Sequence, residues 1–312
     1  MHTPYHHSTA DSSSGSFNGL TLVATPIGNL GDFSPRAIET LTKADLILCE
    51  DTRTTAALLH KYSITTQTEA LHEHNERHRI PSLITSLQSG KNIALVSDAG
   101  MPLLSDPGFQ LVQAAIKADI PLTAIPGANA ALTALVLSGL PPYPFLFSGF
   151  PPSRQNARKK SFTHIQTAEQ NGLTATLIWY EAPHRLRETL EDMICIFGAD
   201  RPAAVTRELT KRFEEVRRGT LSELALFYTH HAPRGEITLL LGPPLKNTPT
   251  TPSQNLDIVL LSLLERHSLK EASTLLASIT GTSKRALYTR ALALTHKQKP
   301  LYAPTPNKSD TP

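Results

Sequence analysis

Short apolar runs alternate with amphipathic segments along most of the chain, and this alternation predicts an α/β fold. The runs at residues 20–26 and 93–96 have the length and composition of buried strands. In the segments between such runs, apolar residues recur every three or four positions, which is typical of a helix with one face on a core. The regular succession of strand and helix predicts a mostly parallel sheet that is covered on both faces.

Proline-rich segments divide this pattern into parts. Residues 141–144 separate the first alternation from a second α/β block that is less purely parallel, and a Pro/Thr linker precedes three short helices. The spacing of these helices is typical of a helix-turn-helix, but it also fits a plain three-helix cap with a solvated basic face. The expected parts are a disordered tail (1–17), two α/β domains (18–140 and 141–244), a linker (245–254), a helical module (255–298) and a loose tail (299–312).

The expected elements follow from the same pattern. In the first domain, strands are predicted at 20–26, 46–49, 70–71, 93–96 and 122–125, with helices at 35–44, 51–62, 75–87, 107–116 and 128–138. In the second, strands are predicted at 145–150, 175–180, 203–209, 214–219 and 237–241, with helices at 162–169, 184–197 and 222–228. Residues 151–160 are expected to form a basic loop.

The stretch from Ile93 to Gly108 reads as strand, small-residue loop and helix, and the chain is organised around it. Asp106 and Pro107 fit the N-cap and first position of the helix. In open α/β sheets, ligands bind beyond the carboxyl ends of strands. The loop holds two carboxylates, Asp98 and Asp106, and little bulk at Ala99 and Gly100, so a ligand can approach its backbone. The alternative is an ordinary turn whose aspartates cap backbone groups.

Composition excludes several classes of protein. The 312 residues allow two domains, and no apolar run reaches the roughly 18 residues that span a bilayer. The first 17 residues lack the apolar core of a secretory signal, so we expect a cytoplasmic protein. The two cysteines, Cys49 and Cys195, lie in apolar runs and are expected to be core thiols.

Positive charge is unevenly distributed. Residues 255–312 carry eight Lys or Arg against four Asp or Glu, whereas the rest of the chain carries 22 against 23. A second local excess of positive charge, with no acid between its members, comprises Arg154, Arg158, Lys159 and Lys160. These two regions are where a polyanion is expected to dock.

The sequence lacks the usual nucleotide-binding and catalytic motifs. No G-x-G-x-x-G follows a strand and no Walker A is present, which argues against nicotinamide and P-loop enzymes. Ser97 and Ser105 have no evident base partner for nucleophilic catalysis. The cluster of His72, His74 and His78 is interpreted as polar surface rather than as a metal site, and no metal is expected.

Seven motifs occur in an order that resembles one family. They are VATPIGNLGD (23–32), EDTRTT (50–55), VSDAGMPLLSDPG (96–108), IPGANAALTAL (125–135), WYEAPHRL (179–186), TRELTK (206–211) and RGEITLLLG (234–242). With these motifs the chain resembles the ribosomal RNA small subunit methyltransferase I family, within the tetrapyrrole-methylase-like superfamily. The resemblance covers residues 20–296.

The resemblance implies two α/β domains with S-adenosylmethionine in the cleft between them, and a homodimer. It implies methylation of the ribose 2′-hydroxyl of a cytidine in the decoding centre of 16S rRNA, in the small ribosomal subunit. The family's cofactor contacts fall on Pro26, Asp98, Ala99, Gly100, Met101, Asn129, Ala130, Tyr180 and Thr210. The chain departs from the family's pattern at two places. Met101 replaces the usual threonine, which removes a hydroxyl, and Ala128-Asn129 replaces the usual small residues or proline after Pro126-Gly127.

The expected chemistry assigns roles to charged residues outside the cofactor set. Glu181, next to Tyr180, is the candidate base for the ribose hydroxyl, but a structural carboxylate paired with Arg185 or Arg207 is the stronger alternative. Phosphate contacts are expected from Arg154, Arg158, Lys159, Lys160, Lys284, Arg285 and Arg290. Two other functions fit the pattern: a small-molecule methylase of the tetrapyrrole type and a non-catalytic RNA-binding protein.

Overall fold

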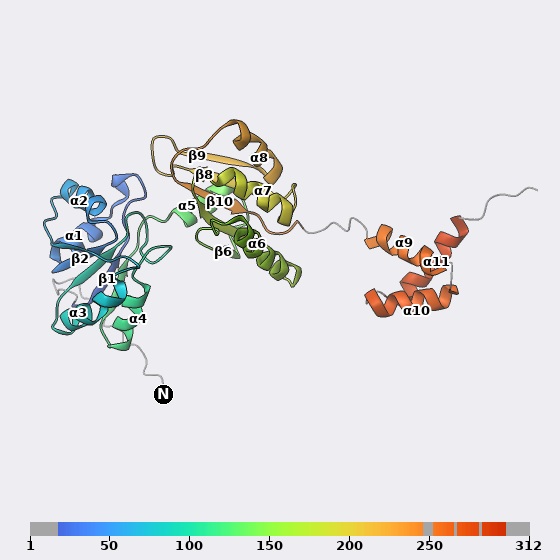
Figure 1. The fold of residues 1–312 in the computed structure, drawn as a ribbon, viewed down its shortest axis with the longest axis horizontal. Coiled ribbons are helices and arrows are strands. Elements are labelled where there is room, and N and C mark those ends of the chain that lie inside the picture. The colour runs from blue at the N-terminus through green and yellow to red at the C-terminus, as the bar shows by residue number, and fades with distance from the viewer. Residues whose placement is uncertain (1–17, 246–251, 265–266, 281–282, 298–312) are drawn as a thin grey trace, which may run out of the picture. The chain divides into compact units, whose positions relative to one another are not determined.

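The computed structural model describes residues 18–245, 252–264, 267–280 and 283–297 (Figure 1). The expected tails at 1–17 and 299–312, and most of the linker at 245–254, lie outside these ranges. The chain divides after Pro244 into two compact units, each of which is described by itself. The first unit contains two α/β lobes, each built on its own sheet.

The first lobe is a five-stranded parallel sheet, as the sequence pattern predicts. Its strands are β1 (Leu20–Val23), β2 (Leu46–Cys49), β3 (Thr68–Ala70), β4 (Ile93–Val96) and β5 (Leu122–Ile125), in the order β3-β2-β4-β1-β5. Leu20 pairs with Ile93 on one side and Leu122 on the other, so β1 and β4 lie inside the sheet. Successive residues of β4 enter opposite cores, because Leu95 packs in one apolar cluster and Val96 in the other.

Helices follow the strands of this lobe along the chain, and side-chain caps fix where several of them begin. They are α1 (Pro35–Lys43), α2 (Thr52–Lys61), α3 (Glu76–Gln88), α4 (Phe109–Lys117) and α5 (Ala130–Ser138), with a short 3-10 turn at Leu30–Asp32. Ser34, Asp51 and Asn129 each accept a backbone N–H at the first turn of α1, α2 and α5. Gly139 ends α5 with φ of 73°, the conformation that favours glycine.

The start of α4 differs from the prediction. Asp106 does not cap this helix, which begins at Phe109 after Gly108, whose φ is 112°. A Cβ on Gly108 would lie 2.4 Å from Cδ2 of Leu95, so packing on β4 requires glycine here. Glu76, from α3, supplies the capping carboxylate instead, because its Oε1 accepts the N–H of Leu111 at 2.9 Å. The carboxylate of Asp106 is therefore not used to cap this helix.

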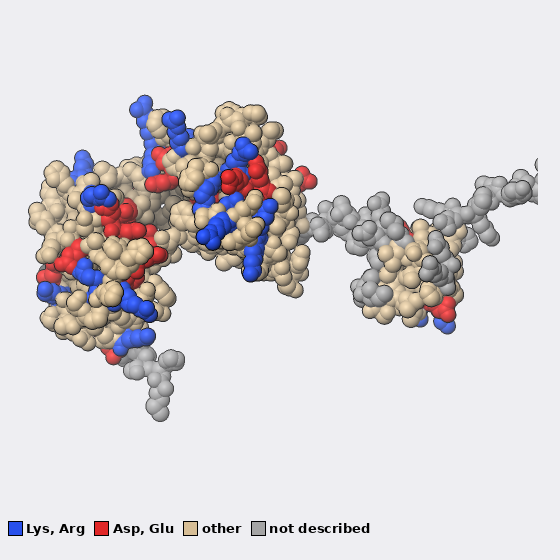
Figure 2. Space-filling model, in the orientation of Figure 1, with Lys and Arg blue, Asp and Glu red and all other residues tan. Residues whose placement is uncertain are grey.

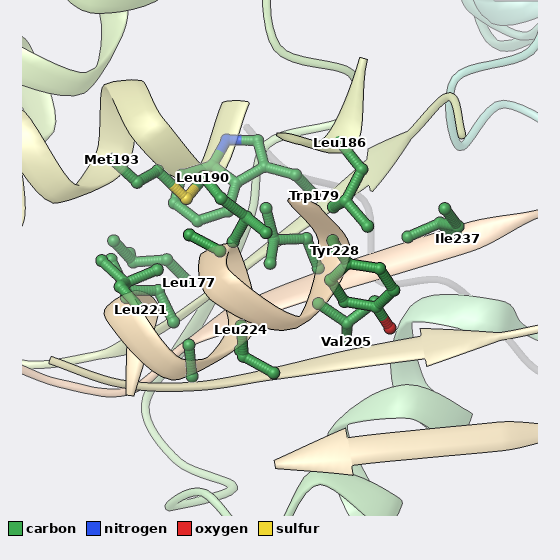
Figure 3. Packing of buried hydrophobic residues seen from close by; sticks show 14 of the residues in the cluster. Leu177, Trp179, Leu186, Leu190, Met193, Val205, Leu221, Leu224, Tyr228 and Ile237 are labelled. Carbon is green, nitrogen blue, oxygen red and sulfur yellow. The ribbon is translucent and has the colours of Figure 1, made fainter. Parts of the chain in front are cut away.

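The second lobe has a mixed sheet. Its strands are β6 (Phe145–Phe147), β7 (Thr176–Glu181), β8 (Pro202–Arg207), β9 (Glu215–Thr220) and β10 (Ile237–Leu241), in the order β6-β7-β10-β8-β9. Only β6 and β7 run parallel, and the other three pairs are antiparallel. The helices are α6 (Gln155–Gln170), α7 (Leu186–Phe197) and α8 (Leu221–His230). Figure 3 shows their shared core, in which Trp179 of β7 packs among Leu186, Leu190 and Met193 of α7.

The basic segment at 151–160 is not the loop that we predicted. Helix α6 begins at Gln155, so Arg158, Lys159 and Lys160 lie in its first two turns. The apolar periodicity did not predict this helix start, because the residues before Phe162 are almost all polar. Phe162 is the first large apolar residue of the helix, and it is fully buried. Helical periodicity then spreads these three side chains over different faces.

Helix α5 joins the two lobes. Ala131, Ala134 and Leu135 of α5 pack with Ile178 of β7, Ala204 of β8 and Leu240 of β10 in one buried cluster. The last helix of the first lobe therefore lies against the sheet of the second. This packing holds the two lobes together.

The second unit holds three helices, α9 (Pro252–Leu264), α10 (Leu269–Thr280) and α11 (Lys284–Lys297). Leu260, Ala272, Leu276, Leu287 and Ala291 form its buried cluster. The predicted capping box is present, because Ser268 and Glu271 exchange side-chain and backbone hydrogen bonds. Helix α9 begins at Pro252, three residues before the predicted start of the module at 255. Across the described ranges, no helix is long and apolar enough to cross a membrane.

Candidate functional site

A hollow of about 360 Å³ lies between the two lobes of the first unit, at the carboxyl ends of the parallel strands. Its volume falls in the range of sites for cofactor-sized molecules. The first lobe contributes the turn after β1 and the loop after β4, and the second lobe contributes the end of β7 and the strands β8 and β10. The lining residues are Ile27, Asp98, Ala99, Leu104, Ser105, Asp106, Ala130, Phe150, Tyr180, Glu181, Ala182, Pro183, Thr206, Leu209, Gly235, Glu236, Ile237 and Thr238.

The loop after β4 is held against the end of β1. Thr25 and Gly100 form a backbone bridge with two hydrogen bonds of 2.9 and 3.1 Å. Gly100 has φ of 88°, and a Cβ on it would lie 3.3 Å from Ile27 Cγ2. The N–H of Asp51 donates to Oδ1 of Asp98 at 3.2 Å, which ties the loop to the start of α2 as well. The loop therefore presents Asp98 and Ala99 on a fixed backbone.

Negative charge is concentrated in this part of the hollow. Burial and the nearby carboxylates of Glu50 and Asp98 raise the pKa of Asp106 to about 6, against a smaller opposing effect of a hydrogen bond with Ser97. Burial and Asp98 also raise the pKa of Glu50. Neighbouring carboxylates repel each other when both are ionised, and a cation between them stabilises their ionised forms. This wall therefore suits a positively charged ligand.

The second lobe supplies aromatic and hydroxyl groups. The ring of Tyr180 makes edge contacts with Phe147 and Phe150, at centroid distances of 4.9 and 5.6 Å. Burial raises the pKa of Tyr180, and a backbone hydrogen bond from Ala131, in the first turn of α5, opposes this effect. Thr206 and Thr238 are buried side by side, with the Thr206 hydroxyl 3.4 Å from the carbonyl oxygen of Thr238. This wall suits a flat, partly polar group.

The structure brings four of the nine expected cofactor residues to the surface of the hollow: Asp98, Ala99, Ala130 and Tyr180. The other five, Pro26, Gly100, Met101, Asn129 and Thr210, are not among its lining residues. Three of these five have structural partners, and that of Gly100 is the backbone of Thr25. Asn129 caps α5 by accepting the N–H of Leu132, and Thr210 Oγ1 accepts the N–H of Asn29 at 3.0 Å, which links the two lobes.

Glu181 lines the hollow, but its carboxylate is already occupied. Its side chain is fully buried, and it accepts hydrogen bonds from the N–H of Ala182 at 2.8 Å and the hydroxyl of Thr189 at 2.5 Å. Arg185 Nε lies 3.3 Å from the same carboxylate. This is the ion pair with Arg185 that the sequence left open as the stronger alternative.

The basic residues of the second lobe separate into buried and exposed groups. Arg158 is fully buried, and its guanidinium donates to Asp192 at 2.8 Å and to the carbonyl oxygen of Ser153 at 3.2 Å. We therefore correct the expectation that Arg158 contacts phosphate, because an RNA strand cannot reach it. Lys159 is half-exposed and lies 3.4 Å from Asp192, whereas Arg154 and Lys160 are exposed. In Figure 2, Lys and Arg side chains gather where Figure 1 shows α6 and α7, with Asp and Glu side chains between them.

In the helical unit, the three expected RNA-binding residues differ in the same way. Lys284 and Arg285 are exposed at the start of α11. Arg290 donates to Asp257 of α9 at 2.5 and 3.1 Å, so part of its charge is neutralised within the unit.

The sequence places Asp106 in the candidate loop but, because of Pro107, as a helix cap and not as a cofactor contact. It does not single out Leu209, Thr206 or Thr238, although all of them line the hollow with Asp106. The threonines lie within strands of the other lobe, where nothing local marks them. The fold also uses Glu76 as a cap, and the described residues contain no group of His, Cys, Asp and Glu that could hold a metal ion.

Comparisons with known proteins agree with this architecture. The family described as Tetrapyrrole (Corrin/Porphyrin) Methylases matches residues 19–225, and the family described as RsmI C-terminal HTH domain matches residues 250–295. Among solved structures, uroporphyrin-III-C-methyltransferase from Thermus thermophilus has a TM-score of 0.50 at 20% identity, over 72% of this chain and 94% of that one. Diphthine synthase has a TM-score of 0.53 at 15% identity, over 72% of this chain and 89% of that one. The expected fold class is confirmed.

Full-length relatives are more similar still. A protein of Mesorhizobium japonicum named ribosomal RNA small subunit methyltransferase I is 46% identical over 276 residues, which is 88% of this chain and 92% of that one. The protein of the same name from Escherichia coli O157:H7 is 40% identical over 288 residues, or 92% and 98% of the two chains. Both the lobes and the helical unit are thus accounted for, and the chain belongs to the ribosomal RNA small subunit methyltransferase I family, within the tetrapyrrole methylases.

Proposed function

We propose that this protein is an S-adenosylmethionine-dependent methyltransferase of small-subunit rRNA, and that it methylates the ribose 2′-hydroxyl of a cytidine in the decoding region of 16S rRNA, in the cytoplasm. The names of the full-length relatives support the rRNA substrate, and the resemblance of the motifs supports the 2′-hydroxyl. The observation that carries the proposal is the acidic and aromatic hollow between the lobes, in a chain that also has the family's helical unit.

The residues of the hollow fit S-adenosylmethionine. When bound, this cofactor supplies an electrophilic methyl group on a cationic sulfur. Asp98 and Asp106 would face that charge, and the raised pKa of Asp106, about 6, shows that the position favours neutralisation of the carboxylate. Ile27, Leu209 and Tyr180 would provide an apolar and aromatic wall for the cofactor. The small residues Ala99 and Ala130 leave room for the ligand.

Three of the five other expected cofactor residues would act by shaping the hollow. Gly100 holds the β4 loop against Thr25, and Asn129 fixes the start of α5 beneath Ala130. Thr210 joins the second lobe to the turn after β1 through Asn29. Accurate placement of the acceptor hydroxyl can account for about 7–11 kcal/mol of the barrier in well-oriented reactions, so a rigid frame around the hollow would support the reaction by positioning. We do not retain Glu181 as the base, because its carboxylate is occupied by Ala182, Thr189 and Arg185.

Phosphates of the RNA would be held by basic residues of both units, two of which, Lys159 and Arg290, are half-exposed and also lie beside aspartates. We propose Arg154, Lys159 and Lys160 on α6, with Lys284, Arg285 and Arg290 on α11. Arg154 follows Phe150, which lines the hollow, by four residues, and Lys159 and Lys160 lie in the first two turns of α6. Such contacts position the RNA without reading its sequence.

We further propose a homodimer. Apolar side chains are exposed on α5 and on the segment that follows it. Leu132 and Val136, four residues apart on α5, are 48% and 74% exposed, and Tyr143 is 83% exposed. Single exposed apolar residues are normal, but two that neighbour each other on a helix, such as Leu132 and Val136, indicate a contact surface.

The experiment that tests the proposed function is methyl transfer from labelled S-adenosylmethionine to small ribosomal subunits that lack the modification. We expect label in the RNA, and nuclease digestion should yield 2′-O-methylcytidine. Label on a base would contradict the ribose assignment, and label on no RNA would contradict the function.

A second candidate is a small-molecule methylase, because the tetrapyrrole methylase family matches residues 19–225. The helical unit distinguishes the two functions, since a small-molecule enzyme has no evident use for it.

A further inference from the structure

The loop that joins β8 and β9, residues 208–214, lies beside the hollow. Leu209 in this loop is buried and lines the hollow, and it packs in the cluster that joins the lobes. Gly28, in the turn after β1, lies so close that a Cβ on it would be 2.4 Å from Cγ of Lys211. The loop therefore forms part of the rim of the cofactor pocket.

Most of the loop is firmly attached. Lys211 Nζ lies 3.0 Å from a carboxylate oxygen of Glu208 and 3.0 Å from one of Glu236. The N–H of Thr210 donates to Glu214 at 2.6 Å, while its hydroxyl accepts the N–H of Asn29. These contacts, from the loop itself and from both lobes, hold its backbone in one conformation.

The backbone of the loop is also strained. Glu208 and Thr210 have φ of 52° and 66°, in the left-handed region that residues with a Cβ rarely adopt. Strain of this kind persists where surrounding contacts impose it, and it collects at functional sites. Two residues that follow Thr210 in the loop, Arg212 and Phe213, are exposed.

Two side chains at the tip make no such attachment. Phe213 is 63% exposed, and the guanidinium carbon of Arg212 lies 5.5 Å from the centre of its ring. Within the described ranges Arg212 has no ion pair, whereas Lys211, Arg207 and Arg217 all pair with glutamates. In Figure 2, basic side chains project where Figure 1 shows the β8–β9 loop.

We propose that Phe213 and Arg212 form a contact for single-stranded RNA at the rim of the pocket, with Phe213 stacking on a base and Arg212 holding a neighbouring phosphate. An exposed aromatic ring beside a free guanidinium is the combination that binds unpaired nucleotides. The acidic wall of the hollow repels phosphate, so a cation at the rim is needed to bring the strand to it. The inference rests on the proposed function, because it takes RNA as the substrate.

The two side chains are tested separately by Phe213→Ala and Arg212→Ala. RNA affinity is measured by fluorescence anisotropy with a labelled single-stranded RNA of mixed sequence, over a series of salt concentrations. For Phe213→Ala we expect about tenfold weaker binding, a value typical of one lost base stack, with the salt dependence unchanged. For Arg212→Ala we expect weaker binding and a salt slope that is lower by about one.

The controls separate a local contact from a general loss. Phe213→Trp should restore binding, because it keeps a stacking surface. Lys117→Ala removes an exposed cation at the C-terminal end of α4 and should change neither affinity nor slope. Affinity for S-adenosylmethionine, measured by calorimetry, should stay within twofold of wild type in every variant.

RNA binding by Phe213→Ala that equals wild type, or a loss that Phe213→Trp does not restore, would overturn the proposal. The two proposals can fail separately. If the wild-type protein does not methylate small subunits but Phe213→Ala still weakens RNA binding, the proposed function is contradicted and the RNA contact is supported. If Phe213→Ala methylates normally and binds RNA like wild type, the proposed function is supported and the RNA contact is contradicted. Binding to another protein through Phe213, with no effect on RNA, also counts against the proposal.

Discussion

At the scale of single residues, two carboxylates dominate the chemistry of the hollow. Asp98 is fixed by the N–H of Asp51, and Asp106 lies near enough to Asp98 and Glu50 for each negative charge to disfavour the next. A protein tolerates such crowding where a cationic ligand relieves it. The sulfonium of the proposed cofactor carries the required charge.

Asp106→Asn tests this crowding through stability. The folded pKa of Asp106, about 6, lies above the ordinary 3.8, so its ionised form destabilises the fold at pH above 6 and the effect disappears below 4. The shift corresponds to about 3 kcal/mol, which solvent screening of this half-buried group reduces to about 1–2 kcal/mol. Urea unfolding should therefore show the variant to be more stable at pH 8 and equal to wild type at pH 4. A variant that is less stable at pH 8 would contradict this.

Asp98→Ala tests the role of the loop in cofactor binding. Loss of this carboxylate should weaken binding of S-adenosylmethionine at least tenfold, because a charge contact is lost, and should leave RNA affinity nearly unchanged. Calorimetry with the cofactor and anisotropy with RNA measure the two effects. Equal losses in both would mean that the loop does not hold the cofactor.

At the scale of elements, the strands and most helices follow from the sequence, because periodicity reports which face is buried. The failures are at helix starts. Pro107 suggested that α4 begins with Asp106. The helix instead begins after Gly108, which packs on Leu95, and its capping carboxylate comes from α3, so both determinants involve residues distant in the sequence. The start of α6 was missed because its first turns are almost wholly polar.

Helix α6 provides a matched pair of variants. Lys159→Glu with Lys160→Glu should weaken RNA binding and flatten its salt dependence, because both side chains reach solvent. Arg158→Ala should instead destabilise the fold, by about 3–5 kcal/mol, because it leaves Asp192 buried without its main partner. Unfolding and anisotropy measurements on both variants separate the two roles. An unchanged salt slope in the double variant would exclude α6 from RNA binding.

At the scale of the whole molecule, the sequence predicts two α/β domains and a helical module, because each has its own apolar pattern and a Pro-rich junction. The structure divides the chain into two compact units, and the first of them contains both α/β lobes. The sequence also predicts part of the hollow, because the loop after β4 is recognisable. Thr206, Thr238 and Leu209 could not be predicted, since they reach the hollow only through the packing of α5 on the second sheet.

Removal of residues 245–312 tests the division of labour between the units. The first unit is compact by itself, so it should still bind S-adenosylmethionine with wild-type affinity. Methylation of small subunits should fall at least tenfold, because basic contacts are lost. Full activity of the truncated protein on small subunits would contradict the RNA-binding role of the helical unit.

Val136→Glu tests the homodimer. A charge at this 74% exposed position of α5 should leave the monomer folded and should disrupt an apolar interface. Analytical ultracentrifugation is expected to give a dimer for wild type and a monomer for the variant. The control is Ile116→Glu. Ile116 is a 53% exposed apolar residue on α4, and its substitution should not alter association. A wild-type protein that sediments as a monomer would refute the proposed dimer.

The account as a whole depends on the hollow between the lobes as the place where S-adenosylmethionine binds, and calorimetric titration tests this most directly. The wild-type chain should bind one equivalent of S-adenosylmethionine, and Ala130→Leu, which fills the hollow, should weaken binding at least tenfold while the unfolding transition stays intact. Absence of binding to the wild-type chain, or undiminished binding to Ala130→Leu, would contradict the account.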